Sequence, residues 1–262
     1  MKILLCGLIA VLLAPPSVYG QAGSAPEDPG SAVFQVVTYD HEPDTDGNFH
    51  GRGFGTGFFI SNDGMALTVS HVVYQVVHDP SKYRLLAVIG KEFYDATVIC
   101  SSRLPYNPTF TNREGVPLTR DVAKIKLSPS TAFEGRKDTL YFLLKDGSRL
   151  EWAKAHAEAL PEFPVLPISE RLEQHVKVIG FGAISALPLK WTTDGELVRT
   201  YAGQDGTPVF DMTFRIPPQP GNSGSPVLND KNEVVGMWAW SYQKEPTKGV
   251  AESSAVLMNP CQ

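Results

Sequence analysis

Ser223 lies in the stretch PGNSGSP, residues 220–226, where its setting favours chemistry at the hydroxyl group. Glycines on both sides allow a tight turn that exposes the serine hydroxyl and lets another backbone approach closely. The amides of Gly221 and Ser223 can then point into one concavity and stabilise an oxyanion. Taken alone, a serine between glycines more often marks an ordinary turn.

A serine becomes a good nucleophile only when a base takes its proton. His71 follows the apolar run Leu67–Val69, and Asp121 directly precedes the apolar run Val122–Leu127, where a carboxylate can orient an imidazole. Singly, His71 is explained as a partly buried histidine and Asp121 as the cap of a strand. Together with Ser223 they predict a nucleophilic site, in the order histidine, aspartate, serine.

Four patches of this sequence resemble the trypsin-like (chymotrypsin-fold) serine peptidases: Gly55–Ile60, Leu67–Val73, Asp121–Ala123 and Gly221–Val227. The motifs are most similar to those of the glutamyl-endopeptidase and HtrA-type branch, and the resemblance runs from about Ala32 to Met258. The stretch after Ser223 is too short for an appended PDZ domain, so the HtrA domain arrangement is not expected.

The resemblance implies an all-β fold of two packed six-stranded antiparallel β-barrels, about residues 32–140 and 165–262, with the site in the cleft between them. It also implies roles for the residues above. His71 would act as general base and then general acid, Asp121 would fix the tautomer of His71, and Ser223 would form the acyl-enzyme. The amides of Gly221 and Ser223 would form the oxyanion hole.

The resemblance assigns substrate binding to Gln219 and to the segment Ala239, Trp240 and Ser241. No acidic residue stands in 216–220 and no histidine in 236–239, so neither a basic nor a glutamate side chain at the cleaved position has a charge partner there. Asn222 stands where the animal digestive enzymes have an aspartate that pairs with a newly cut N-terminus. Activation through such an ion pair is therefore not expected.

Short apolar runs separated by turn residues predict strands throughout the chain. One segment differs: Ser148 and Glu151 match a capping box, helix-forming residues follow, and Pro161 ends them, so a connecting helix is predicted over residues 148–160. A short C-terminal helix is also expected. The predicted strands are Val33–Val37, Gly53–Ile60, Met65–Val69, Tyr83–Gly90, Tyr94–Cys100, Val122–Leu127, Val176–Phe181, Glu196–Ala202, Val209–Ile216, Val227–Leu228 and Val234–Trp240.

The first twenty residues have the pattern of a signal peptide: Lys2, a short apolar run, then small residues before a cut expected after Gly20. An uncleaved anchor is the alternative, which the short apolar run disfavours. Residues 21–31 are interpreted as a flexible entry segment. We therefore expect a secreted protein, extracellular or periplasmic, that keeps Cys100 and Cys261. Secretion permits these two cysteines to pair, but the sequence does not decide whether they do.

The composition is that of an ordinary globular protein, with 42% hydrophobic and 19% charged residues and a formal net charge of −5. Without a basic run there is no electrostatic footprint for nucleic acid, and no segment after the leader is apolar enough to span a membrane. No metal and no cofactor are expected, because zinc-type spacings are missing and residues 44–48 are interpreted as a hairpin tip rather than a calcium loop.

The leading hypothesis is a secreted serine endopeptidase acting on polypeptide substrates. Two alternatives stay open at this point. A pseudo-protease would use the same fold only to bind a partner, although it would have no need of three catalytic side chains. An esterase would share the acyl chemistry, and fold alone does not separate it from a peptidase.

Overall fold

The computed structural model describes most of the chain after residue 24. The described residues are 25–102, 120–130, 139–143, 147, 149–153, 155–184, 187–203, 205–242 and 244–262. The predicted signal peptide, residues 1–20, lies outside them. Within the predicted entry segment, η1 (Pro29–Ala32) is a 3-10 turn capped by Asp28, whose carboxylate accepts the Gly30 N–H at 2.9 Å. No described helix is long and apolar enough to cross a membrane.

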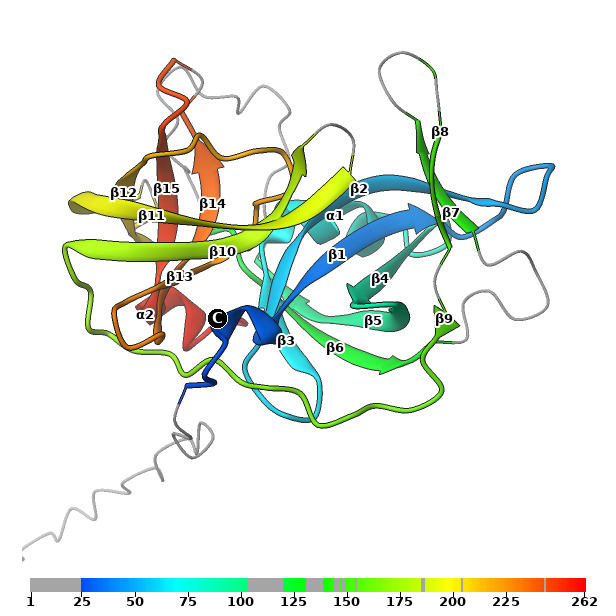
Figure 1. Ribbon diagram of the computed structural model, residues 1–262, viewed down its shortest axis with the longest axis horizontal. Coiled ribbons are helices and arrows are strands. Elements are labelled where there is room, and N and C mark those ends of the chain that lie inside the picture. Colours follow the sequence, from blue (N-terminus) through cyan, green and yellow to red (C-terminus); the bar gives the residue numbers. More distant parts are fainter. Residues whose placement is uncertain are drawn as a thin grey trace, which may run out of the picture.

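Six antiparallel strands close into a first barrel, coloured blue to green in Figure 1. Closure occurs because β1 pairs with β4 on one side and with β2 on the other, which gives the order β1-β4-β5-β6-β3-β2. The strands are β1 (Val33–Asp40), β2 (Phe49–Phe59), β3 (Met65–Thr68), β4 (Tyr83–Ile89), β5 (Glu92–Ser101) and β6 (Ala123–Pro129).

The second barrel is also a closed ring of six antiparallel strands, in the order β10-β11-β12-β15-β14-β13. It occupies the yellow to red half of Figure 1. The strands are β10 (His175–Ile184), β11 (Leu187–Ala202), β12 (Pro208–Phe214), β13 (Pro226–Leu228), β14 (Val234–Ser241) and β15 (Lys248–Ser253). The expected all-β fold of two six-stranded barrels is thus confirmed, and each strand predicted from the sequence overlaps an observed one.

Each barrel has its own apolar interior, and a further apolar cluster joins the two barrels. Burial of such side chains contributes about 25 cal/mol for each Å² removed from water, so a shared cluster holds the barrels in one fixed arrangement. Side chains that project from opposite sides of the interface can therefore form one site. The shared cluster contains Val33, Phe58, Leu67, Val69 and Val122 of the first barrel together with Ile179, Leu228, Val234, Met237 and Ala239 of the second.

The connecting helix predicted over residues 148–160 is wrong. The described part of this segment forms β8 (Arg149–Ala153) and β9 (Ala155–His156), while Ser148 and Lys154 lie outside the described residues. β8 pairs with β7 (Thr139–Leu143), β7 adds to the edge of β2, and β9 adds to β5. Trp152 of β8 packs against Phe142 of β7 with ring centroids 5.1 Å apart. Tertiary packing of the tryptophan on an available sheet edge overrides the helix propensity of the alanines.

Two helices stand among the described residues. α1 (Ser70–His78) follows β3 and was not anticipated by the sequence interpretation, whereas α2 (Ser254–Leu257) is the expected short C-terminal helix. The predicted hairpin tip at residues 44–48 is confirmed as the turn between β1 and β2, with Asp44 accepting the N–H groups of Asp46 and Asn48. Cys100 and Cys261 form a disulfide with their Cα atoms 5.5 Å apart, which decides the pairing that the sequence left open.

Candidate active site

His71 and Asp121 are joined by two hydrogen bonds. The His71 backbone N–H donates to Asp121 Oδ1 at 3.0 Å, and His71 Nδ1 lies 2.6 Å from Asp121 Oδ2. A carboxylate only accepts hydrogen bonds, so Nδ1 carries the proton and Nε2 is left as the acceptor. Asp121 is fully buried, whereas the His71 side chain is 23% exposed. The carboxylate thus fixes both the orientation and the tautomer of an imidazole that faces outward.

The backbone on both sides of this pair is held by two serines, the buried Ser70 and the half-buried Ser102. Ser70 Oγ, at the start of α1, donates to the Val122 carbonyl at 2.7 Å. Ser102 Oγ lies 2.7 Å from Ser70 Oγ, donates to the Arg120 carbonyl at 2.6 Å and accepts the Val122 N–H at 3.1 Å. The residue before His71 and the two neighbours of Asp121 therefore share one network, which limits movement of the histidine relative to the aspartate.

Ser223 follows a turn whose geometry suits an oxyanion hole. The Asn222 N–H donates to the Gln219 carbonyl at 3.1 Å, and Gly221 has φ of 100°. A positive φ at the third residue, with proline before it, defines a type II turn, so Pro220 and Gly221 are the residue types this turn requires. Among the described residues, neither the Gly221 N–H nor the Ser223 N–H donates a backbone hydrogen bond. Both donors thus stay available for another acceptor.

The turn carrying Ser223 is fastened to the first barrel by Thr56 of β2. The Thr56 N–H donates to the Ser223 carbonyl at 2.8 Å, and Thr56 Oγ1 donates to the Gly221 carbonyl at 2.9 Å. Thr56 Oγ1 also accepts the Phe181 N–H from β10 at 2.9 Å. One fully buried threonine therefore fixes both residues of the expected oxyanion hole from across the barrel interface.

Close approach at two glycines brings the histidine and serine segments together. A Cβ at Gly55 would lie 2.5 Å from the side chain of Val72, the neighbour of His71, and 2.9 Å from the Ser223 carbonyl oxygen. A Cβ at Gly224 would lie 2.0 Å from the Thr56 carbonyl oxygen, and Gly224 also has φ of 90°. The segments that carry His71 and Ser223 therefore lie next to each other at the barrel interface. No hydrogen bond joins the Ser223 hydroxyl to the His71 ring in this structure.

The residues expected to bind substrate lie at different depths. The Trp240 ring is 5.1 Å from the His71 ring, and Ser241 is exposed at the end of β14. Gln219 is the first residue of the type II turn that precedes Ser223, and its side-chain amide donates to the Pro217 carbonyl at 3.2 Å. Ala239 is buried in the cluster between the barrels.

Asn222 is buried, and its side-chain oxygen and nitrogen have no hydrogen-bond partner among the described residues. The contacts from Thr56, rather than the Asn222 side chain, hold the turn. Thr56 was not singled out from the sequence, although its place between Gly55 and Gly57 indicates a residue approached closely by other backbone.

A second carboxyl group lies behind Asp121. Glu252 of β15 is fully buried, and its Oε1 accepts the Asp121 backbone N–H at 3.0 Å. Burial, together with the negative charge of Asp121, raises the pKa of Glu252 to about 8. The sequence interpretation missed this residue, whose one visible signal is an acid directly after the apolar pair Val250–Ala251 and shortly before α2.

The C-terminal segment closes over the same region. Arg120, next to Asp121, donates to the carbonyl groups of Val256, Asn259 and Gln262, and its backbone N–H donates to Asp205. The disulfide between Cys100 and Cys261 ties this segment to β5 of the first barrel. The loop that carries Asp121 is therefore held from the second barrel as well as the first.

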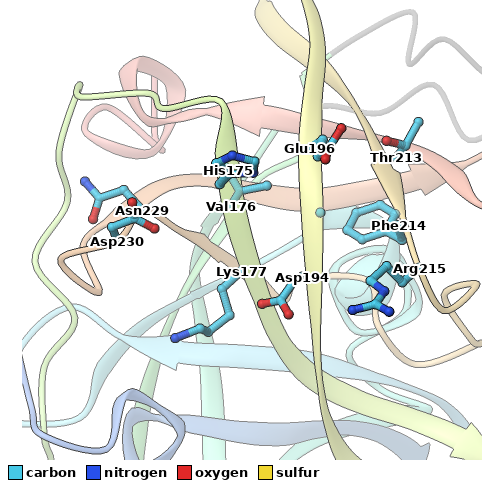
Figure 2. A pocket seen from close by; sticks show the side chains of 11 residues that line it. His175, Val176, Lys177, Asp194, Glu196, Thr213, Phe214, Arg215, Asn229 and Asp230 are labelled. Carbon is cyan, nitrogen blue, oxygen red and sulfur yellow. The ribbon is translucent and has the colours of Figure 1, made fainter.

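A cavity of about 420 Å³ lies elsewhere, on the second barrel, and its lining is shown in Figure 2. Basic and acidic side chains alternate around it, including Lys177, Arg215, Asp194 and Glu196. None of the residues expected in the site lines this cavity. No cluster of histidine, cysteine and acidic residues suited to a metal ion occurs within the described ranges.

Comparison with known proteins identifies the family of this chain. Residues 55–237 match the family described as trypsin-like peptidase domain, which covers most of the two barrels. The chain belongs to the trypsin-like peptidase family. No curated protein matches the sequence.

Solved structures with a similar fold include a serine endoprotease from Yersinia pestis, at 18% identity and a TM-score of 0.53, over 87% of this chain and 61% of that one. They also include the Rv3671c protease in an inactive form, at 17% identity and a TM-score of 0.51, over 87% and 86% of the two chains. A serine-to-alanine mutant of Rv3671c from M. tuberculosis H37Rv gives 16% identity and a TM-score of 0.51, over 96% and 94%. This chain thus spans less than two thirds of the Yersinia enzyme.

Proposed function

We propose that this protein is a secreted serine endopeptidase that cleaves polypeptides through an acyl-enzyme formed on Ser223. The observation that carries the proposal is the fixed pairing of His71 with the buried Asp121, at 2.6 Å, beside a serine turn bound to the same barrel through Thr56. An oriented neutral imidazole next to a serine between two glycines is the arrangement that nucleophilic acyl transfer requires.

In the first half of the reaction, His71 Nε2 accepts the Ser223 hydroxyl proton while the oxygen attacks the scissile carbonyl carbon. His71 then gives that proton to the leaving amine. In the second half, water attacks the ester, and the proton passes through His71 back to Ser223. Asp121 stays ionised throughout and stabilises the imidazolium, because it already accepts both His71 N–H groups.

The negative charge that develops on the carbonyl oxygen needs donors fixed in advance. We assign this role to the Gly221 and Ser223 N–H groups of the type II turn. Loss of one such donor typically costs about 100-fold to 1,000-fold in turnover. The Thr56 contacts to both residues support this assignment, since a turn held by two hydrogen bonds across the interface is ordered before substrate arrives.

Secretion is part of the proposal and is supported by two observations. The first is the signal-peptide pattern of residues 1–20. The second is the disulfide between Cys100 and Cys261, because disulfides persist mainly in oxidising compartments. The test is expression in a cell with an intact secretory route, followed by N-terminal sequencing of the protein in the medium or periplasm. A product that starts at Gln21 supports the proposal, and an intact N-terminus retained in the cytoplasm contradicts it.

The catalytic assignment is tested by labelling with a fluorophosphonate and mapping the modified residue by mass spectrometry. We expect the label on Ser223, and Ser223→Ala should lose both labelling and peptide cleavage while keeping its fold. Ser225→Ala is the matched control, because Ser225 lies in the same loop and its hydroxyl has no hydrogen-bond partner in the described part of the chain. Its labelling should be unchanged.

The same experiment separates the alternatives. A folded wild-type protein that takes no label would be a binding protein. A label on another serine would remove Ser223 as the nucleophile. Hydrolysis of simple esters, without cleavage of any peptide in a mixed-sequence panel, would indicate an esterase.

A further inference from the structure

Glu252 is a buried acid that the mechanism above does not use. Its side chain is fully buried on β15, and Oε1 accepts the Asp121 N–H at 3.0 Å. Its other oxygen, Oε2, is also buried and has no hydrogen-bond partner among the described residues. Such a group needs a reason to be there, because burying an isolated carboxylate is unfavourable, whereas burying a leucine or methionine in its place is not.

The surroundings of Glu252 favour its uncharged form. The nearest charges are Asp121 and Asp205, which both disfavour ionisation, and Arg120, which favours it. The Arg120 guanidinium is bound to carbonyl groups of the C-terminal segment rather than to Glu252. On the adjacent strands, the residues paired with Glu252 are Met237 of β14 and Val209 of β12, which carry no charge.

Two carboxyl groups that share a dry site do not both ionise easily. Asp121 is the ionised member, because it already accepts two hydrogen bonds from His71. Glu252 is then the neutral member, with its carbonyl oxygen accepting the Asp121 N–H. Since a charged Oε2 would meet no donor, ionisation favours entry of water or departure of the side chain. Either event removes the bond that holds the Asp121 backbone.

We propose that Glu252 is a positioning residue of this peptidase: its uncharged carboxyl fixes the Asp121 backbone so that both Asp121 oxygens stay directed at His71, and its ionisation limits activity at alkaline pH. This proposal rests on the function proposed above for His71, Asp121 and Ser223. On this proposal, loss of the Glu252 proton sets the upper pH limit of peptide hydrolysis.

The test compares wild type, Glu252→Gln and Glu252→Ala in peptide hydrolysis between pH 5 and 10. Glu252→Gln keeps an oxygen that accepts the Asp121 N–H but cannot ionise. We expect wild-type kcat/KM to fall above about pH 8, as the group loses its proton, and Glu252→Gln to keep its activity there. Glu252→Ala should lose turnover by about 100-fold at every pH with little change in KM, because a shift of about 1 Å in a catalytic group has that effect.

Glu196→Gln, an exposed glutamate on β11, is the matched control and should reproduce the wild-type pH profile. Fluorophosphonate labelling at pH 7 is run on every variant. If Glu252→Gln labels normally but shows the same alkaline fall as wild type, the role of Glu252 is refuted while the function stands. If the folded wild type does not label at all, the proposed function itself fails. Should Glu252→Ala not fold, the comparison of wild type with Glu252→Gln still decides the question.

Discussion

Removing the disulfide between Cys100 and Cys261 should cost this protein a large part of its stability. The two cysteines are 161 residues apart in the sequence, so the bond closes a loop that contains every strand of the second barrel. On the chain-entropy account, a closed loop of this length restricts the unfolded chain by about 5 kcal/mol at 25 °C. Total stabilities of folded proteins are about 5–15 kcal/mol, so the loss decides whether the protein stays folded under mild stress.

The assay is urea unfolding followed by tryptophan fluorescence, with and without reductant. The protein should start at Gln21, so that Cys100 and Cys261 are its only cysteines, and should carry Ser223→Ala to prevent self-digestion. We expect the unfolding midpoint to fall markedly on reduction. The same protein with Cys100→Ser and Cys261→Ser should show the lower midpoint under both conditions, which controls for direct effects of the reductant.

The position of the bond adds a functional consequence. Cys261 lies between Asn259 and Gln262, whose carbonyl groups accept hydrogen bonds from Arg120 beside Asp121. In the protein that keeps Ser223, reduction of the disulfide should therefore lower peptide hydrolysis before the protein unfolds. Equal free energies of unfolding for the oxidised and reduced protein would refute the entropy argument. Equal activities in dilute reductant would refute the connection to Asp121.

Three further predictions concern the site. Gly224→Ala should destabilise the protein severely, because the added methyl meets the Thr56 carbonyl oxygen at a positive φ; thermal unfolding would show it, and a wild-type melting temperature would contradict it. Glu252→Gln should become more stable relative to wild type as pH rises from about 5 to about 8. In wild type the folded state keeps the Glu252 proton up to about pH 8, whereas the unfolded chain loses it near pH 4.5. The free energy of unfolding of wild type therefore falls by about 1.4 kcal/mol for each pH unit in this range. Urea unfolding at both pH values measures this, and parallel curves for the two proteins would count against it. A panel of short peptides should show little preference for Lys, Arg or Glu at the cleaved position, and a strong preference for one of them would reveal a charge partner outside residues 216–220 and 236–241.

The parts of the fold that follow from local patterns could be predicted from the sequence. Short apolar runs identify strands such as β1 and β14, which are buried along almost their whole length. The glycines around Ser223 are also visible, since a turn with positive φ leaves few other choices. The segments around His71 and Asp121 could be interpreted as parts of a nucleophilic site only because they precede that serine in the order histidine, aspartate, serine.

The rest depends on contacts between distant segments. The region over β8 has the residues of a helix, yet Trp152 reaches the interior only if the chain pairs with β7. In the sequence Thr56 has the pattern of an ordinary strand residue. Its role becomes visible only in the structure, where the turn before Ser223 in the second barrel packs against it. Glu252 follows an apolar run as a surface acid would, and nothing local shows that Asp121 lies next to it. A sequence pattern records what a residue prefers locally, not which partner it meets across an interface.

The contacts at Thr56 also bear on how the enzyme becomes active. In a site that waits for a new N-terminus, a buried carboxylate beside the nucleophile supplies the charge that the terminus neutralises. Here that position is Asn222, and the turn is instead held by uncharged hydrogen bonds from Thr56 to Gly221 and Ser223. These bonds join the two packed barrels, so we expect folding itself to order the proposed oxyanion hole. We therefore expect proteins that start at Gln21 and at Ala32 to be active with or without one extra N-terminal residue. Loss of activity on adding that residue, in a protein that remains folded, would show that a terminus-dependent step exists.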